Sequence, residues 1–437
     1  MAHPTSMNNE SISIRNAQTL IPSRYLLVAL TFLLSLLLYI DRACISAATD
    51  PIRSALGLNE KEMAWVLSAF ALGYALFQTP GGLLADRFGP RVTLTVVVSF
   101  WSLFTGLTAA TWNLVSMLAV RFLFGAGEAG AFPTMARAFY SWIPMSERGR
   151  VQGINFSGSR LGAAFALPVV AWMITAFGWR ETFVTWALLG FGWAILWYLW
   201  FHNDPAEHPR ISAAELDHIR KTRQQAKDDK SHQPKLSATV LLRSRNMWLA
   251  MAQYFCSNFT FFFALTWLFP HLKKTYQLEP VQAGLFAAAP LLCGAFGNWF
   301  SGCMVDRIYR QNRWALSRRA PAMLGFALSA MGLITSVYME RPLTAVIFLS
   351  IAIFGADMTL APSWALCIDI GRKHSGAVSG TMNMAGNLGS FLTGLAFAYL
   401  QAWTGSVVPF FFVGAGLNLL AVVLWTLVRP EKGLEEY

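Results

Sequence analysis

Six charged residues stand inside long apolar runs of the sequence. They are Asp41, Arg42, Arg121, Glu128, Arg160 and Asp357. A charge at membrane depth is costly unless it faces water or a partner, so such residues mark functional sites by default. These six side chains are therefore the first candidates for a site.

The three arginines are candidates to bind an organic anion. Arginine stays charged, and its planar guanidinium group fits a carboxylate through two parallel hydrogen bonds. We predict that Arg42, Arg121 and Arg160 line one water-filled cavity. For Arg160 several roles are open: it could hold the distal carboxylate of a dicarboxylate, hold the carboxylate of an aromatic acid, or balance Asp357 or Glu128.

The carboxyl groups are candidates to carry protons. Burial and a neighbouring arginine act in opposite directions on the protonation of a carboxyl group, so Asp41 and Glu128 could load and release a proton. Arg121 and Glu128 are seven residues apart and share a helix face, where they either address one cavity or neutralise each other. Asp41 and Arg42 point about 100° apart on a helix and are expected to have separate partners. Asp357 is a further possible cavity acid.

The apolar runs that carry these charges have the length of membrane spans. Of the 437 residues, 55% are hydrophobic and only 13% are charged, about half the charged share of a soluble domain. A helix needs about 20 apolar residues to cross a bilayer. The predicted spans are Tyr25–Ala48, Met63–Leu84, Val92–Thr111, Leu114–Ala136, Val151–Thr175, Thr182–Phe201, Met247–Pro270, Val281–Val305, Ala320–Tyr338, Leu343–Leu366, Ser375–Gln401 and Val407–Val428.

These twelve spans predict an all-α membrane protein in two sets of six helices. The predicted parts are a cytoplasmic tail at 1–23, a six-helix bundle at 24–201, a cytoplasmic linker at 202–246, a second six-helix bundle at 247–428 and a cytoplasmic tail at 429–437. Arginines crowd the loops on one face of the predicted bundles. By the positive-inside rule, that face and both termini are cytoplasmic.

The two sets of spans contain similar segments. Gly149–Gly162 aligns without gaps on Gly376–Gly389, and Gly82–Arg91 is matched by Gly302–Arg307. A duplicated helical unit is typical of transporters, in which two bundles move about a site near the midplane. The glycines would let helices slide against one another or would serve static close packing.

The segment Gly82–Arg91 resembles the signature loop of the major facilitator superfamily, and Gly302–Arg307 repeats it weakly. The resemblance covers nearly the whole chain, from Arg24 to about Pro430. It implies two bundles of six transmembrane helices with both termini cytoplasmic. It also implies a gating role, at the cytoplasmic faces of the bundles, for Gly82, Asp86, Arg87, Gly89, Arg91, Asp306 and Arg307.

Within that superfamily the chain is similar to the anion:cation symporters, which include bacterial galactonate, glucarate and hexuronate permeases. The likeness rests on Tyr39–Arg42, on Gly127–Pro133 and on Pro362–Trp364. It implies that Asp41 and Glu128 couple protons and that the neighbouring arginine at position 42 holds the substrate carboxylate. The function it implies is the import of a small organic anion, such as a sugar acid, by proton symport.

Several polar side chains complete the predicted substrate site. They are Tyr39, Tyr74, Gln78, Ser159, Trp364, Asn383 and Asn387. The resemblance implies that Tyr39, Tyr74, Trp364 and Asn383 contact a sugar acid, and that Ser159 matches a polar residue of the galactonate-type symporters. Hydroxyl-bearing substrates need such donors and acceptors. Ordinary hydrogen bonds between helices are the alternative for each residue.

Other classes of function lack a sequence signal. We find no catalytic constellation, metal-ligand spacing or phosphate-binding Gly-Lys-Ser/Thr run, so we expect no enzyme, no metal and no cofactor other than protons as the coupling ion. The basic residues are scattered over short loops, which disfavours nucleic-acid binding. The expected partners are a small carboxylate, protons and the lipid bilayer, for a monomer in a bacterial inner membrane. Proton-coupled efflux of drugs or metabolites is the alternative function.

Overall fold

The computed structural model describes residues 21–224 and 238–434, and these residues form helices joined by short connections. The predicted tail residues 1–20 and 435–437 and the predicted linker residues 225–237 lie outside the described ranges. The helices are α2 Ser23–Ala47, α3 Thr49–Leu56, α4 Glu60–Phe88, α5 Pro90–Thr108, α6 Leu114–Glu128, α7 Ala131–Trp142, α8 Arg148–Phe177, α9 Trp179–Trp200, η1 Pro205–Glu207, α10 Ala213–Thr222, α11 Ala238–Arg243, α12 Arg245–Thr266, α13 Leu268–Thr275, α14 Pro280–Arg310, α15 Trp314–Val337, α16 Pro342–Met358, α17 Leu360–Gly371, η2 Arg372–His374, α18 Ser375–Thr404 and α19 Val408–Leu427.

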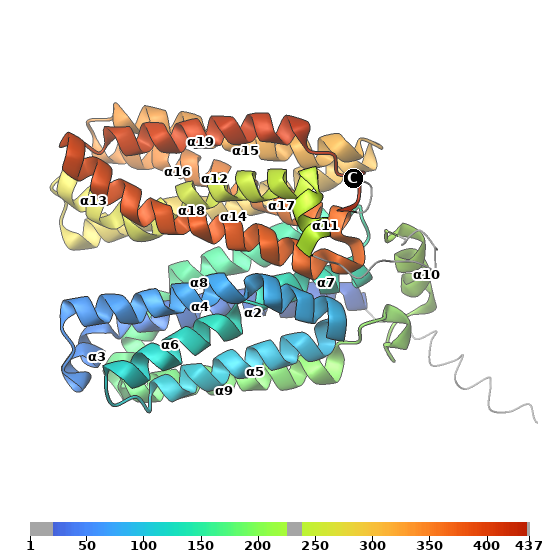
Figure 1. Cartoon of the computed structure of the whole chain (residues 1–437), viewed down its shortest axis with the longest axis horizontal. Helices are drawn as coiled ribbons and strands as arrows, with labels where there is room; N and C mark the ends of the chain where they lie inside the picture. Colours follow the sequence, from blue (N-terminus) through green and yellow to red (C-terminus); the bar gives the residue numbers. More distant parts are fainter. Residues whose placement is uncertain (1–20, 225–237, 435–437) are drawn as a thin grey trace, which may run out of the picture.

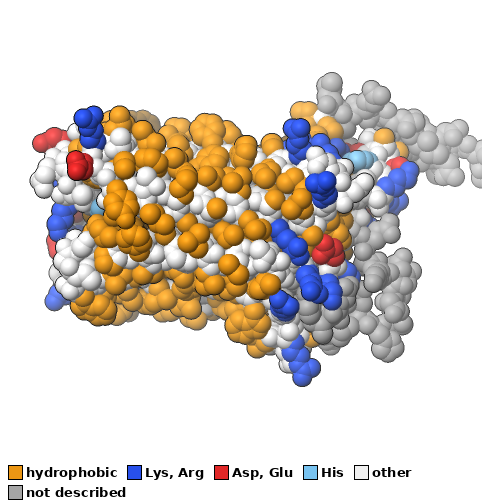
Figure 2. All heavy atoms as spheres, turned by 90° about the horizontal axis from the view of Figure 1, so that it is seen from above, with side chains coloured by type: hydrophobic (Ala, Val, Ile, Leu, Met, Phe, Trp, Pro, Cys, Tyr) orange, Lys and Arg blue, Asp and Glu red, His pale blue; other side chains and the backbone are white. Residues whose placement is uncertain are grey.

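The helices lie nearly parallel to the long axis of the molecule in two halves (Figure 1). Helices α2 to α9 form one half, α12 to α19 form the other, and α8 packs on α14 and α4 on α18 across the boundary. Figure 2 shows hydrophobic side chains over the wall of the molecule, with Lys and Arg gathered toward one end. We call this the arginine-rich end; α4 and α14 finish there, and their last turns carry the exposed residues Arg87 and Arg310.

Within the described residues, eight helical stretches are long and apolar enough to cross a membrane, and a ninth is added if the bent helix α8 counts as one span. One of these stretches, Pro342–Thr404, holds α16, α17, η2 and α18 in succession. Helix α4 is not among the eight, and it carries charges near both ends. The helical architecture is therefore as predicted, while the number of spans stays a prediction.

Three predicted spans are each broken into two helices. The breaks separate α6 from α7, α12 from α13 and α16 from α17, and the third residue of each second helix is a proline: Pro133, Pro270 and Pro362. Proline lacks an N–H group, and its ring clashes with the carbonyl group four residues earlier. The continuous spans expected from hydropathy alone are interrupted at these points for that reason.

Two aspartates of the predicted gating motifs join the halves at the arginine-rich end. Asp86 of α4 accepts hydrogen bonds of 3.0 and 2.8 Å from the backbone N–H groups of Gly376 and Ala377 in α18. Asp306 of α14 does the same in the first turn of α8, at 2.8 and 3.1 Å. A carboxylate is favourable there because the first amides of a helix lack intrahelical partners and carry partial positive charge.

The basic residues of the motifs lie elsewhere. Arg87 and Arg307 are exposed, and Arg91 donates to the backbone oxygen of Tyr198 in its own half at 2.9 Å. Gly89 has a φ of +80°, in the region that favours glycine, where the chain turns from α4 into α5. In the structure, the motif contacts that cross the boundary are thus made by the aspartates and not by these arginines.

A buried ion cluster adds a third contact between the halves. Asp369 of α17 accepts hydrogen bonds from Arg148 of α8 at 2.5 Å, from Arg318 of α15 at 2.8 Å and from the indole of Trp314 at 3.0 Å. All three charged side chains are fully enclosed. The hydrogen bonds that join the halves thus extend from the arginine-rich end inward, and the structure is closed at that end.

Close packing of glycines makes this closure testable. A Cβ atom at Gly149 would lie 2.6 Å from the backbone oxygen of Gly302 and 2.6 Å from Cβ of Val305, so valine at position 149 cannot fit the closed arrangement. We expect Gly149→Val to open the arginine-rich end. Electron–electron resonance between spin labels at positions 87 and 307, in a background without other cysteines, should report longer distances.

Gly192→Val is the matched control, because a Cβ atom there meets nothing within 4 Å. The control should keep the distance distribution of the parent protein. If Gly149→Val also keeps it, packing at this glycine does not limit closure.

Candidate substrate-binding site

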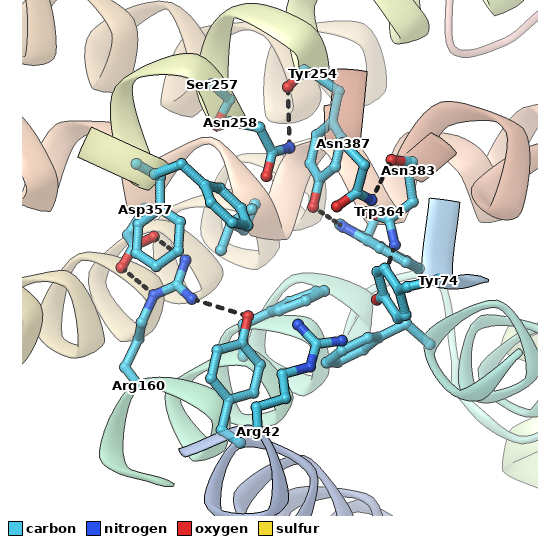
Figure 3. A pocket seen from close by; sticks show the side chains of 16 residues that line it. Arg42, Tyr74, Arg160, Tyr254, Ser257, Asn258, Asp357, Trp364, Asn383 and Asn387 are labelled. Carbon is cyan, nitrogen blue, oxygen red and sulfur yellow. Dashed lines mark hydrogen bonds and ion pairs between the residues drawn. The ribbon is translucent and has the colours of Figure 1, made fainter. Parts of the chain in front are cut away.

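A cavity lies between the two halves (Figure 3). Helices α2, α4, α7 and α8 contribute from one half, and α12, α16, α17 and α18 contribute from the other. The lining residues are Tyr39, Arg42, Tyr74, Phe132, Phe156, Arg160, Tyr254, Ser257, Asn258, Phe261, Phe262, Asp357, Leu360, Trp364, Asn383 and Asn387.

Arg42 lies against aromatic rings and is paired with a buried acid. Its guanidinium carbon is 4.4 Å from the ring centre of Tyr74 and 5.0 Å from that of Tyr39. Its Nε donates a 2.5 Å hydrogen bond to Oε1 of Glu128, whose other oxygen is buried without a hydrogen bond. Aromatic faces attract a cation, and the carboxylate neutralises it. The aromatic rings therefore orient the Arg42 guanidinium group in the cavity, and a single carboxylate, that of Glu128, balances its charge.

Arg160 forms the second ion pair, and this pair crosses the boundary between the halves. Its Nε and Nη2 atoms donate to the two oxygens of Asp357 in α16 at 2.7 and 2.6 Å. Nη1 is 3.5 Å from the hydroxyl of Tyr39, and the guanidinium carbon is 3.5 Å from the ring centre of Phe261. Of the roles left open for Arg160, the structure thus shows the one in which it neutralises Asp357.

Asp41 and Arg121 are buried behind the cavity and do not line it. Asp41 accepts a 3.1 Å hydrogen bond from the indole of Trp101, and its other oxygen has no hydrogen bond. The Arg121 guanidinium carbon lies 4.4 Å from the ring centre of Phe124. As expected, Asp41 and its neighbour Arg42 have separate partners. Among the described residues, Glu128 is ion-paired with Arg42 and not with Arg121.

Five predicted polar side chains line the cavity: Tyr39, Tyr74, Trp364, Asn383 and Asn387. Asn383 donates to the hydroxyl of Tyr74 at 3.4 Å across the boundary, and the indole of Trp364 donates to the hydroxyl of Tyr254 at 2.9 Å. Asn387 donates to the backbone oxygen of Asn383. These groups offer donors and acceptors beside the two arginines.

Two predicted binding residues lie away from the lining. Gln78 is fully buried where α4 meets α18, and a Cβ atom at Gly380 would lie 2.5 Å from its backbone oxygen. Ser159 is also fully buried, next to Arg160 in sequence but on another face of α8. The structure thus separates these two residues from the arginines with which they were grouped.

Sequence reasoning missed one whole wall of the cavity. Helix α12 contributes Tyr254, Ser257, Asn258 and Phe261, which are spaced i, i+3, i+4 and i+7 and so lie on one helix face. The spacing was visible in the sequence, but none of these residues is charged. A polar stripe in an otherwise apolar span is the signal that could have identified them.

The arrangement suits a small polar anion. Two arginines, several hydroxyl and amide groups and aromatic walls meet in one cavity between the halves, and a few convergent polar groups with aromatic walls are typical of small-molecule sites. In the described part of the chain, no group of three or more His, Cys, Asp and Glu side chains could hold a metal ion.

Comparisons with known proteins agree with the fold. The family model of the Major Facilitator Superfamily matches residues 31–394, and the chain belongs to this family. It is 36% identical to a probable sulfoacetate transporter of Cupriavidus necator over 94% of this chain and 97% of that protein. It is 32% identical to a probable galactarate/D-glucarate transporter of Escherichia coli over 94% and 96%.

A solved proton:xylose symporter shares the fold, with a TM-score of 0.72 at 16% sequence identity, over 94% of this chain and 97% of that one. The family and these relatives are transporters and not enzymes. They confirm the resemblance seen in the sequence and the membrane-spanning, multi-pass class of the protein. A transporter of the Major Facilitator Superfamily is therefore the class that the family model and these relatives define.

Arg42 provides the direct test of the site. Arg42→Ala removes one cavity guanidinium group, so we expect anion affinity to fall by about a hundredfold, the upper range for hydrogen bonds to a charged group. Isothermal titration in detergent measures the affinity, and gel filtration checks the fold.

Loss of Arg42 also leaves Glu128 buried without its partner, which is destabilising by itself. The variant Arg42→Ala/Glu128→Gln removes that difficulty. An affinity like that of the parent protein in the double variant would contradict the role of Arg42.

Proposed function

We propose that the protein is a secondary active transporter that imports a small organic anion by proton symport through alternating access. The observation that carries the proposal is the placement of Arg42 and Arg160 in one cavity between the halves, each paired with an acid. The named activities of the relatives, the transport of sulfoacetate and of galactarate or glucarate, support an acidic substrate.

The charge of the cavity supports coupling to protons. Two guanidinium groups are balanced by Glu128 and Asp357, so an incoming anion adds uncompensated negative charge at a depth where bulk water screens charges weakly. A proton on Glu128 removes the charge that faces Arg42 and leaves that arginine to the substrate. Asp41, with one buried oxygen free of hydrogen bonds, is the second proton-coupling candidate.

The proposal includes a topology. Twelve transmembrane helices form two six-helix bundles at 24–201 and 247–428, and the tails and the linker 202–246 lie in the cytoplasm. The loops rich in arginine support this orientation by the positive-inside rule. The structure then represents the state closed toward the cytoplasm. The protein acts as a monomer in a bacterial inner membrane, and its cargo is a carboxylate that moves with protons.

A ligand screen tests the substrate class. Ligands that bind only the folded protein raise its melting temperature. We expect stabilisation of the purified protein by sulfoacetate, an aldarate, a uronate or an aromatic carboxylate. Stabilisation by lipophilic cations and by none of these acids would replace uptake with efflux as the function.

Glu128 separates proton coupling from binding. Glu128→Gln carries no titratable proton, so we expect uptake driven by a pH gradient in proteoliposomes to fall at least tenfold, while counterflow without a gradient persists. The exposed Glu279→Gln, at the start of α14 on the far side of the molecule, is the control and should keep both activities. Equal loss of uptake, counterflow and binding would identify Glu128 as a structural partner of Arg42.

A further inference from the structure

We infer that the substrate is a compact dianion and that Arg160 binds its second acidic group through the Nη1–Nη2 edge of the guanidinium group. The inference rests on the proposed function and specifies its substrate class. The resemblance to the symporters supplies no role for Arg160.

The geometry of the Arg160–Asp357 pair leaves one edge of the guanidinium group available. Asp357 occupies the Nε–Nη2 edge with both of its oxygens. Among the described residues, the remaining amino group, Nη1, makes a single hydrogen-bond contact, with the Tyr39 hydroxyl at 3.5 Å, the long limit for a hydrogen bond. Arginine has five N–H donors, so a second carboxylate or a sulfonate can bind the Nη1–Nη2 edge while Asp357 stays in place.

The surroundings of Arg160 fix the direction of this edge. The ring of Phe261 lies 3.5 Å from the guanidinium carbon and covers one face of the group. Asp357 fixes the rotation about that face, and Gly294 leaves space for its carboxylate, since a Cβ atom there would overlap Oδ2 of Asp357. Nη1 faces the hydroxyl of the lining residue Tyr39, and Figure 3 shows Arg160 with its dashed contacts to Asp357. Asp357 is thus a positioning residue for Arg160.

A shared neighbour brings the two cavity arginines close together. The Arg42 guanidinium carbon lies 5.0 Å from the ring centre of Tyr39, and Nη1 of Arg160 lies 3.5 Å from the hydroxyl of the same residue. Both cations therefore flank one tyrosine side chain. A molecule with two acidic groups a few bonds apart can reach both, whereas a monoanion binds only one of them.

Two pairs of ligands test the inference, because in each pair a hydroxymethyl group replaces one carboxylate. The pairs are sulfoacetate with isethionate and galactarate with galactonate. Affinities are measured by isothermal titration on the full-length protein. For at least one pair, we expect the dianion to bind about tenfold or more tightly than its monoanion, the range for one hydrogen-bonded charge.

Arg160→Lys keeps the charge, but an ammonium group lacks the second pair of N–H donors that a guanidinium group offers. The ratio of dianion to monoanion affinity should therefore fall about tenfold. Arg180→Lys is the matched control, because Arg180 donates to backbone oxygens outside the cavity, and it should keep the ratio. If Arg160→Lys does not fold, the neutral pair Arg160→Gln/Asp357→Asn gives the same test.

The outcomes separate two failures. If a monoanion binds as tightly as its dianion in both pairs, or if the ratio survives in the Arg160 variants, the second acidic group does not bind Arg160 and the inference is wrong. If all four ligands fail to bind while the protein is folded, the proposed anion transport itself fails, and the inference fails with it.

Discussion

A buried guanidinium group must keep a carboxylate or an aromatic face beside it, and the centre of this molecule is arranged around that requirement. Arg42 is paired with Glu128 and Arg160 with Asp357, and each guanidinium group also lies over at least one aromatic ring. Arg121, which has no ion pair within the described residues, lies over Phe124. An unpaired charge at this depth would be costly, so the positions of these partners are strongly constrained.

The two cavity pairs differ in what they join. Arg42 and Glu128 belong to the same half, whereas Arg160 and Asp357 belong to opposite halves. A change in the charge of Glu128 therefore alters the site without separating the halves. Any movement that parts α8 from α16 at this level must break the Arg160–Asp357 pair or carry its two helices together. Binding events at Arg160 are thus linked to the relative position of the halves.

Much of this arrangement follows from the sequence by simple physical rules. Charges inside apolar runs identified Arg42, Arg160 and Asp357 as cavity residues, because hydrocarbon tolerates few charges. Hydropathy alone does not predict the helix breaks before Pro133 and the two corresponding prolines, because these breaks result from the backbone geometry of proline. The wall formed by α12 carries no charge, and the burial of Gln78 depends on helix rotation. The pairing of Glu128 with Arg42 depends on tertiary contacts between α2 and α6, which no local rule supplies.

The acids at the arginine-rich end and the acids of the cavity have different surroundings. Asp369 accepts from two arginines and an indole, and Asp306 accepts from two backbone amides and an arginine. By contrast, the hydrogen bonds of Glu128 and Asp357 each come from one arginine, among the contacts of the described residues. An acid with several donors is held in one position while the structure is closed, whereas the surroundings of an acid with one donor change with whatever that donor binds. The first arrangement suits a contact that closes one end, and the second suits a site in which the cargo competes for the donor.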